Sequence, residues 1–273
     1  MYKKEYDYFF RTNNYGLVQY NDIFPDKESI LFLGDSFLEG QGSDPWFNSL
    51  EDKHNKFQLI NGGKLGYNFQ QFNYVLEYFL SKNFKINHVV IIFIGDDYDR
   101  ENFFISDKTL SCLSFYKNCK NDEIFYAYPI GINLESYLDQ IRLNRKKTPL
   151  FNKGNYFLLH GRIYNFLKLN FFEGNNVVKN RNALRLIVNN SNIKNKISFL
   201  HVSNKTESSR GKKSFMSEKV IKDILNYKIN VQECKLELAD YLIYDGHPNK
   251  QGYKKISDCV EQIIKNDNFS INN

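Results

Sequence analysis

The sequence of 273 residues contains no long apolar run. No stretch approaches the ~20 apolar residues that a membrane-spanning helix needs. The opening residues, Met1 to Asp7, also lack the apolar core of a secretory signal peptide. We therefore expect no membrane span and a cytoplasmic location.

Cysteine is scarce, and its positions fit no known pairing motif. The four residues, none of them in a C-x-x-C pair, are Cys112, Cys119, Cys234 and Cys259. No cluster of His and Cys has the spacing of a metal site, and no glycine-rich phosphate-binding motif occurs. We expect reduced, mostly buried thiols in a reducing compartment, with no metal and no cofactor.

Charge of one sign is only mildly in excess, because the formal net charge is +6 with a pI near 8.9. Two basic clusters span Arg142 to Lys147 and Lys205 to Lys213. An acidic glycan, a nucleotide sugar or nucleic acid would suit such clusters. Solvated helix faces and loops are the commoner explanation, and we favour it. Since no nucleic-acid recognition motif occurs, we expect no nucleic-acid partner.

Short apolar runs alternate with segments of helical spacing. The runs predict buried parallel strands over Ser29 to Gly34, Phe57 to Asn61, Val89 to Ile94, Ile197 to Val202 and, more weakly, Ile229 to Val231. Helices are predicted over Pro45 to Glu51 with Asp44 as its cap, Tyr67 to Lys82 and Lys250 to Lys265. Alternating strands and helices predict a doubly wound α/β domain with a parallel sheet.

The segment from about residue 100 to residue 195 interrupts this alternation. Its helix-like pieces are Leu134 to Lys147, Tyr156 to Phe171 and Asn180 to Val188. We interpret it as a helical insertion in a single domain of residues 1–273. It is either a lid over a site or an ordinary long crossover.

The stretch around Ser36 carries the strongest functional signal. An apolar run ends abruptly at Gly34-Asp35-Ser36, which places a serine at the carboxyl end of a strand, where α/β sheets hold their sites. Far along the chain, Asp245 and His247 stand together before a predicted helix. A serine, a histidine and a carboxylate are the parts of an acyl-transferring nucleophile.

Four sequence blocks in order resemble those of the SGNH hydrolase superfamily, also called GDSL-like esterases. They are Gly34-Asp35-Ser36, Asn61 followed by Gly66, a partial Gly-x-Asn-Asp at Gly95-Asp96-Asp97, and an approximate Asp-x-x-His at Asp245-Gly246-His247. The resemblance implies a flavodoxin-like α/β/α sandwich around a central parallel sheet.

The resemblance also implies a role for each matched residue. Ser36 would be the nucleophile and His247 its general base, with Asp245 orienting the imidazole. The backbone N–H groups of Ser36 and Gly66 would stabilise the oxyanion, which needs converging donors. Glycine at position 66 lets the backbone approach a substrate without a side chain in the way.

Two departures from the family pattern leave alternatives open. The family has an Asn amide as third oxyanion donor where this chain offers Asp96 or Asp97, and an ionised carboxylate only accepts hydrogen bonds. Either that carboxyl is protonated, or it points away, or two donors suffice. Asp245 stands two residues before His247 instead of three. His247 either uses Asp245 or a backbone carbonyl as its partner.

The sequence thus predicts a serine esterase or acyltransferase that forms an acyl-enzyme on Ser36. Its expected substrate is a small molecule or oligosaccharide, namely an O-acyl group, in particular O-acetyl, on a bacterial carbohydrate. Trp46 either lines a sugar site or, as we favour, packs in the core. The alternative is a catalytically weak or inactive SGNH-fold protein that binds or assembles components in polysaccharide biosynthesis, which the acidic third block supports.

Overall fold

The computed structural model describes residues 11–43, 46–54, 56–101, 174–193, 196–243 and 245–266. The chain divides into two compact units, residues 1–102 with 174–273, and residues 103–173. All described residues belong to the first unit. The predicted helices Leu134 to Lys147 and Tyr156 to Phe171, with the basic cluster Arg142 to Lys147, lie outside the described residues.

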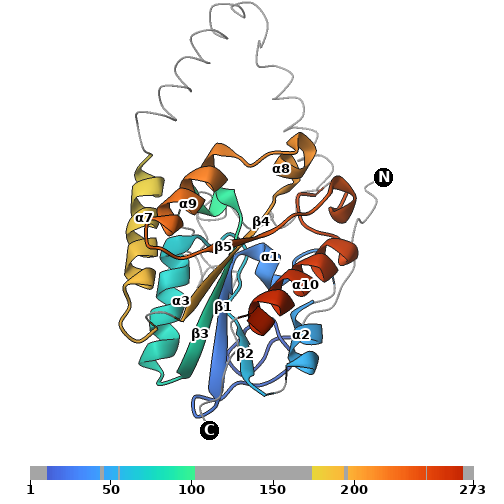
Figure 1. The fold of residues 1–273 in the computed structure, drawn as a ribbon. Helices are drawn as coiled ribbons and strands as arrows, with labels where there is room; N and C mark the ends of the chain where they lie inside the picture. The colour runs from blue at the N-terminus through green and yellow to red at the C-terminus, as the bar shows by residue number, and fades with distance from the viewer. Residues whose placement is uncertain are drawn as a thin grey trace, which may run out of the picture. The chain divides into compact units, whose positions relative to one another are not determined.

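In the described part of the chain, five parallel strands form one sheet in the order β2-β1-β3-β4-β5 (Figure 1). They are β1 (Glu28–Gly34), β2 (Gln58–Asn61), β3 (Lys85–Phe93), β4 (Ile197–Val202) and β5 (Val231–Cys234). Helices cover both faces, so the inner strands are apolar almost throughout. This strand order is the flavodoxin-like one, which confirms the predicted α/β/α sandwich.

Two hydrophobic cores fill the space between the sheet and its helices. On one face lie α3 (Phe69–Ser81), α7 (Asn175–Val188) and α9 (Phe215–Leu225). On the other lie α1 (Ser36–Glu39), α2 (Phe47–Lys53) and α10 (Lys250–Asn266). Shorter pieces, α8 (Lys205–Arg210), η1 (Gly95–Tyr98) and η2 (Leu238–Asp240), follow strands. Among the helices of the described ranges, none has the length and apolar character needed to cross a membrane.

Most predicted elements are present with shifted ends. The predicted fifth strand was misplaced, because β5 is a half-exposed strand at the sheet edge and so carries no continuous apolar run. The helix expected from Pro45 begins at Phe47, with Trp46 at its N-cap instead of Asp44; residues 44 and 45 lie outside the described ranges. The predicted piece Asn180 to Val188 belongs to α7, which packs against the sheet as a crossover helix between β3 and β4.

A disulfide joins Cys234, at the end of β5, to Cys259 in α10. The prediction of reduced thiols is therefore wrong for this pair. Nothing in a spacing of 25 residues marks two cysteines as partners; the fold brings their Cα atoms to 5.9 Å. Because structural disulfides are typical of oxidising compartments, the cysteines no longer support the cytoplasmic location, which stays a prediction. Cys112 and Cys119 lie outside the described residues.

One buried acidic side chain lies in α2, the helix that packs beside β2. Glu51, in α2, is 7% exposed, and its Oε1 accepts a hydrogen bond of 2.9 Å from Gln19 Nε2. Burial raises the pKa of Glu51 to about 7, although hydrogen bonds from Asn21, Tyr20 and Gln19 oppose the shift. The folded chain therefore holds a proton that the unfolded chain has lost between pH 4.5 and about 7.

This proton makes the stability depend on pH with a definite sign. Stability falls as pH rises through that window, because the folded state binds the extra proton. Glu51→Gln cannot ionise, so its free energy of unfolding should not fall in this way. We expect the difference in free energy of unfolding between the variant and the wild type to shift in favour of the variant from pH 5 to pH 8, by on the order of 3 kcal/mol or less. Urea unfolding at both pH values measures this. Glu28→Gln, on an exposed carboxylate, is the control; a gain for Glu51→Gln that is the same at both pH values would contradict the prediction.

Candidate active site

The strand order places a site between β1 and β3. The chain leaves β1 toward β2 on one side and later returns to β3 on the other, so the connections diverge at the carboxyl ends of β1 and β3. Flavodoxin-like folds bind their ligands at such a switch point. Ser36 follows β1 and Gly95 follows β3, so two of the sequence blocks meet there.

Local geometry fixes Ser36 at the first position of α1. Asp35 caps this short helix, its Oδ1 accepting from Phe37 N at 2.9 Å. Gly34 is needed before it, because a Cβ there would lie 2.8 Å from the carbonyl oxygen of Ile92. Ser36 itself is 5% exposed. The turn from strand to helix thus leaves the serine hydroxyl little freedom to change direction.

Ser36, His247 and Asp245 come together although the serine and the histidine are 211 positions apart. Ser36 Oγ lies 2.9 Å from His247 Nε2, and His247 Nδ1 lies 2.6 Å from Asp245 Oδ1. With Nδ1–H donating to the carboxylate, Nε2 is left as an acceptor for the serine proton. Of the two partners left open for His247, the side chain of Asp245 is the one in contact.

The shorter spacing between Asp245 and His247 is accommodated by a tight turn. Asp245 Oδ1 accepts from the backbone N–H of His247 at 3.1 Å as well as from its ring. Burial opposes ionisation of this carboxyl, but the hydrogen bonds and charge of His247 outweigh it and lower the pKa of Asp245. The imidazole also packs edge-on against the Phe37 ring, with centroids 5.9 Å apart.

Gly66 lies on a loop that runs beside α1. Lys64 N donates to Gly34 O at 3.3 Å, and Leu65 N donates to Glu39 Oε2 at 2.7 Å. Gly66 has φ +77°, and a Cβ built on it would meet no atom within 4 Å. The left-handed backbone favours glycine, and the space in front of it is open.

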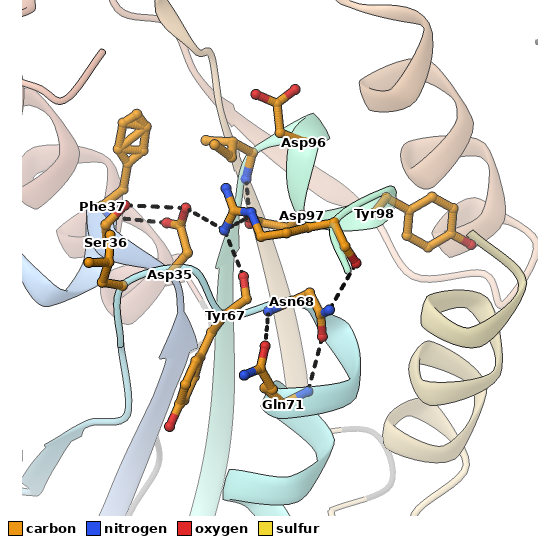
Figure 2. A network of polar contacts seen from close by, with 12 residues as sticks. Asp35, Ser36, Phe37, Tyr67, Asn68, Gln71, Asp96, Asp97 and Tyr98 are labelled. Carbon is orange, nitrogen blue, oxygen red and sulfur yellow. Dashed lines mark hydrogen bonds and ion pairs between the residues drawn. The ribbon is translucent and has the colours of Figure 1, made fainter. Parts of the chain in front are cut away.

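The two acidic residues of the third block face in different directions. Asp97 is fully buried, accepts from Ile94 N at 3.1 Å and pairs with Arg100 at 2.8 Å. Asp96 is exposed, and its carboxylate points away from that network (Figure 2); its Oδ1 accepts from Asn204 Nδ2 at 3.4 Å. Burial raises the pKa of the Asp97 carboxyl, and the nearby charge of Asp35 adds to the effect. Asp97 is therefore committed to groups of the chain itself, while the three alternatives for the third oxyanion donor stay open.

Arg100 was not identified from the sequence, yet it joins three of the loops around Ser36. Its Nη1 lies 3.3 Å from Asp35 Oδ2, 2.8 Å from Asp97 Oδ1 and 2.8 Å from the carbonyl oxygen of Tyr67, which follows Gly66. In the sequence it stands three residues after Asp97, at the start of the predicted insertion, and nothing there marks it as part of the site.

Arg100 affects which acceptor receives the hydrogen bond of the Ser36 hydroxyl. A hydroxyl has one proton to donate, and Ser36 Oγ lies 3.5 Å from Asp35 Oδ2 but 2.9 Å from His247 Nε2. Since Arg100 and Phe37 N occupy the Asp35 carboxylate, the shorter contact to the imidazole is favoured.

Trp46 and His201 are both buried and have structural contacts. Trp46 is 6% exposed in the core and donates from Nε1 to Phe37 O at 3.0 Å. His201 is 3% exposed and lies 3.0 Å from Ser217 Oγ and 3.4 Å from Glu207. All three residues of that Ser–His–Glu group are buried, Ser217 completely, whereas the His247 side chain is 20% exposed. Within the described ranges, no group of three or more His, Cys, Asp or Glu residues could hold a metal ion.

No protein-family model and no curated protein sequence matches the chain. Among solved structures, it is similar to a protein from Lactobacillus plantarum, with a TM-score of 0.44, 12% identity and coverage of 88% of this chain and 97% of the other. A member of the lipolytic protein G-D-S-L family from Veillonella parvula DSM 2008 gives a TM-score of 0.42, 12% identity and coverage of 87% and 98%. The SGNH-hydrolase family esterase AlinE4 gives 0.33, 10%, 90% and 99%.

The motif order of the chain resembles that of the SGNH hydrolases. Two of these structures carry the name of the superfamily that the sequence blocks resemble. Their TM-scores lie below 0.5, so the function of this chain has to be argued from its own geometry.

The buried charges around Arg100 lead to a stability prediction. Removing one partner of a buried ion pair costs about 3–5 kcal/mol; we expect about 3 kcal/mol for Arg100→Met, because the Arg100 side chain is 27% exposed. The loss should be larger at pH 8 than at pH 5. Burial raises the pKa of the Asp97 carboxyl and the Arg100 charge opposes the shift, so without Arg100 the ionised form of Asp97 becomes more costly in the folded state. Urea unfolding at both pH values measures it.

The control for this prediction is Lys53→Met, which removes an exposed ion pair with Glu261 and should cost about 1 kcal/mol or less. A loss for Arg100→Met no greater than that of the control would show that the network carries little of the stability.

Proposed function

We propose that this chain is a serine esterase or acyltransferase that acts on O-acyl groups through an acyl-enzyme on Ser36. The observation that carries the proposal is the contact of Ser36 Oγ with His247 Nε2 at 2.9 Å, with Asp245 at 2.6 Å from the other ring nitrogen. Such a relay is the arrangement that activates a serine.

In the first half-reaction, Ser36 Oγ attacks the carbonyl carbon while its proton passes to His247 Nε2. A new C–O bond forms and the carbonyl π electrons move onto the oxygen. Asp245 stabilises the imidazolium through Nδ1–H. The tetrahedral intermediate then expels the alcohol oxygen, which takes the proton from His247, and the acyl group stays on Ser36.

The oxyanion needs donors that face it. We assign the backbone N–H groups of Ser36 and Gly66, since the Gly66 loop is tied to α1 and open in front. Removing one such donor in a hydrolase costs about 10²–10³ in kcat. Asp97 is committed to Arg100 and Ile94 N, so two backbone donors are the set that this chain offers in place of the family's three.

In the second half-reaction, His247 Nε2 takes a proton from the incoming hydroxyl, whose oxygen attacks the acyl carbon. The bond between that carbon and Ser36 Oγ then breaks, and Ser36 Oγ takes the proton back from His247. Water as that nucleophile gives hydrolysis, and an alcohol gives acyl transfer. The same residues serve both reactions, so the proposal covers either.

We propose O-acetyl groups of a bacterial carbohydrate as the substrate class. This finer proposal rests on the sequence, namely on the aromatic residues of the insertion from about residue 100 to residue 195, since aromatic rings stack on sugar faces. A preference for an acidic sugar draws less support from the basic cluster Lys205 to Lys213, because Lys205 and Lys213 bind groups of the chain itself.

The nucleophile is tested by covalent labelling. We expect intact-mass analysis after fluorophosphonate treatment to show one adduct on the wild type and none on Ser36→Ala. His247→Ala should label and turn over roughly 10³-fold more slowly, as triad deletions do. Ser209→Ala, on an exposed serine of α8, is the matched control. Labelling that survives Ser36→Ala would overturn the proposal, and a folded wild type that never labels would favour the binding or assembly alternative, which the acidic Asp96 and Asp97 keep open.

The substrate class is tested by a panel of esters in the presence of a chelator. We expect turnover of p-nitrophenyl acetate and of an O-acetylated oligosaccharide, with little of a long-chain ester. The chelator should have no effect, because the proposed steps use side chains and backbone N–H groups alone. Turnover of the long-chain ester with none of the acetylated sugar would refute the substrate class.

A further inference from the structure

Lys205 holds three backbone carbonyls of the loop that carries Asp245 and His247. Its Nζ donates to Leu242 O at 2.6 Å, to Ile243 O at 2.8 Å and to Asp245 O at 3.0 Å. An ammonium has three donors, so these contacts use all of them. A lysine in the basic cluster Lys205 to Lys213 is thus occupied inside the molecule.

The loop is closed at its base and filled at its centre by this ammonium. Tyr241 and Pro248 form an antiparallel bridge, and Leu242 N donates to His247 O at 3.0 Å. The carbonyl oxygens of Leu242, Ile243 and Asp245 converge on Lys205 Nζ, and without a cation there their partial negative charges would repel one another. A cation at that point removes the repulsion, and charge-assisted hydrogen bonds are stronger than neutral ones.

Asp245 is held at both of its acceptor groups. Lys205 binds its backbone carbonyl, while its carboxylate Oδ1 receives the backbone N–H and the ring Nδ1 of His247. The side chain of Asp245 is still 28% exposed, so packing alone does not fix its direction. The backbone contact to Lys205 supplies a fixed anchor for the turn.

We infer that Lys205 is a positioning residue, which sets the Asp245 turn and through it the direction of the His247 imidazole toward Ser36. This rests on the proposed function. Lys205 begins α8, directly after β4, so it relates the loop to the rigid sheet. The contacts from Lys205 also explain how Asp245 can orient His247 across the shortened Asp-x-His spacing, because they fix the backbone of this turn.

The test compares Lys205→Met with Lys213→Met. The first removes the ammonium while keeping an unbranched side chain; the second removes a cation of the same cluster that pairs with Glu233. With p-nitrophenyl acetate we expect Lys205→Met to lower kcat by about 10²-fold, the cost of a small misplacement, with KM changed less than about twofold. Lys213→Met should stay near wild-type kcat. Fluorophosphonate labelling should slow by the same factor as kcat.

Chemical rescue separates positioning from a merely structural role. Lys205→Ala keeps Cβ, so propylammonium matches the atoms that were removed, and it should restore at least tenfold in kcat where propanol restores none. If Lys205→Met fails to fold, Lys205→Gln decides in the same way, with an expected loss of about tenfold. If folded Lys205 variants keep the wild-type kcat, or if propylammonium restores no activity, the positioning role of Lys205 is overturned while the proposed function stands. A wild type that neither labels nor turns over overturns the proposed function and this inference with it.

Discussion

The hydrogen bond between Ser36 and His247 is the constraint on which the rest of the site depends. Its partners come from opposite ends of the chain, one after the first strand and one before the last helix. A bond of this length, 2.9 Å, requires that two loops be held to within a fraction of an ångström. The parallel sheet supplies the coarse placement, because it brings the carboxyl ends of its strands to one edge.

The fine placement is supplied by charged side chains that bind backbone carbonyls. Arg100 reaches the carbonyl of Tyr67 on the Gly66 loop, and Lys205 reaches three carbonyls on the His247 loop. A loop lacks the regular hydrogen bonds of a helix or strand, so its carbonyls need partners from elsewhere. Burying Asp35 and Asp97 beside one arginine carries a desolvation penalty. These buried charges lie beside the loops that carry Ser36 and Gly66, whose positions matter for the proposed chemistry.

The sequence predicted the sheet well, since buried parallel strands are continuous apolar runs, as at Ile197 to Val202. It also predicted the residues that meet at the site, because Ser36 ends such a run. The edge strand β5 was misplaced, since two of its four residues are partly exposed and one is exposed. Helix α9 was missed, although Val220 and Ile224 have helical spacing.

Three further features lay beyond sequence reasoning for a common reason. Arg100 and Lys205 act on backbone carbonyls, and every residue has one, so no partner residue type marks the contact. The backbone turn of η1 decides whether Asp96 or Asp97 is the buried residue. A one-residue shift in the alignment of the third block exchanges the two, so the sequence did not distinguish them. The pairing of Cys234 with Cys259 depends on where α10 crosses β5. In each case the information is in the path of the chain and not in residue type.

The disulfide has a consequence for how the molecule responds to cutting. It closes a ring of chain whose ends are Cys234 and Cys259, and Asp245 and His247 lie inside that ring. A protease that cleaves one peptide bond within the ring leaves both fragments covalently joined. The nicked protein would migrate as one species without reductant and as two with it. Whether the cut falls before or after His247, the fragment that carries this histidine would stay covalently joined to the fragment that carries Ser36.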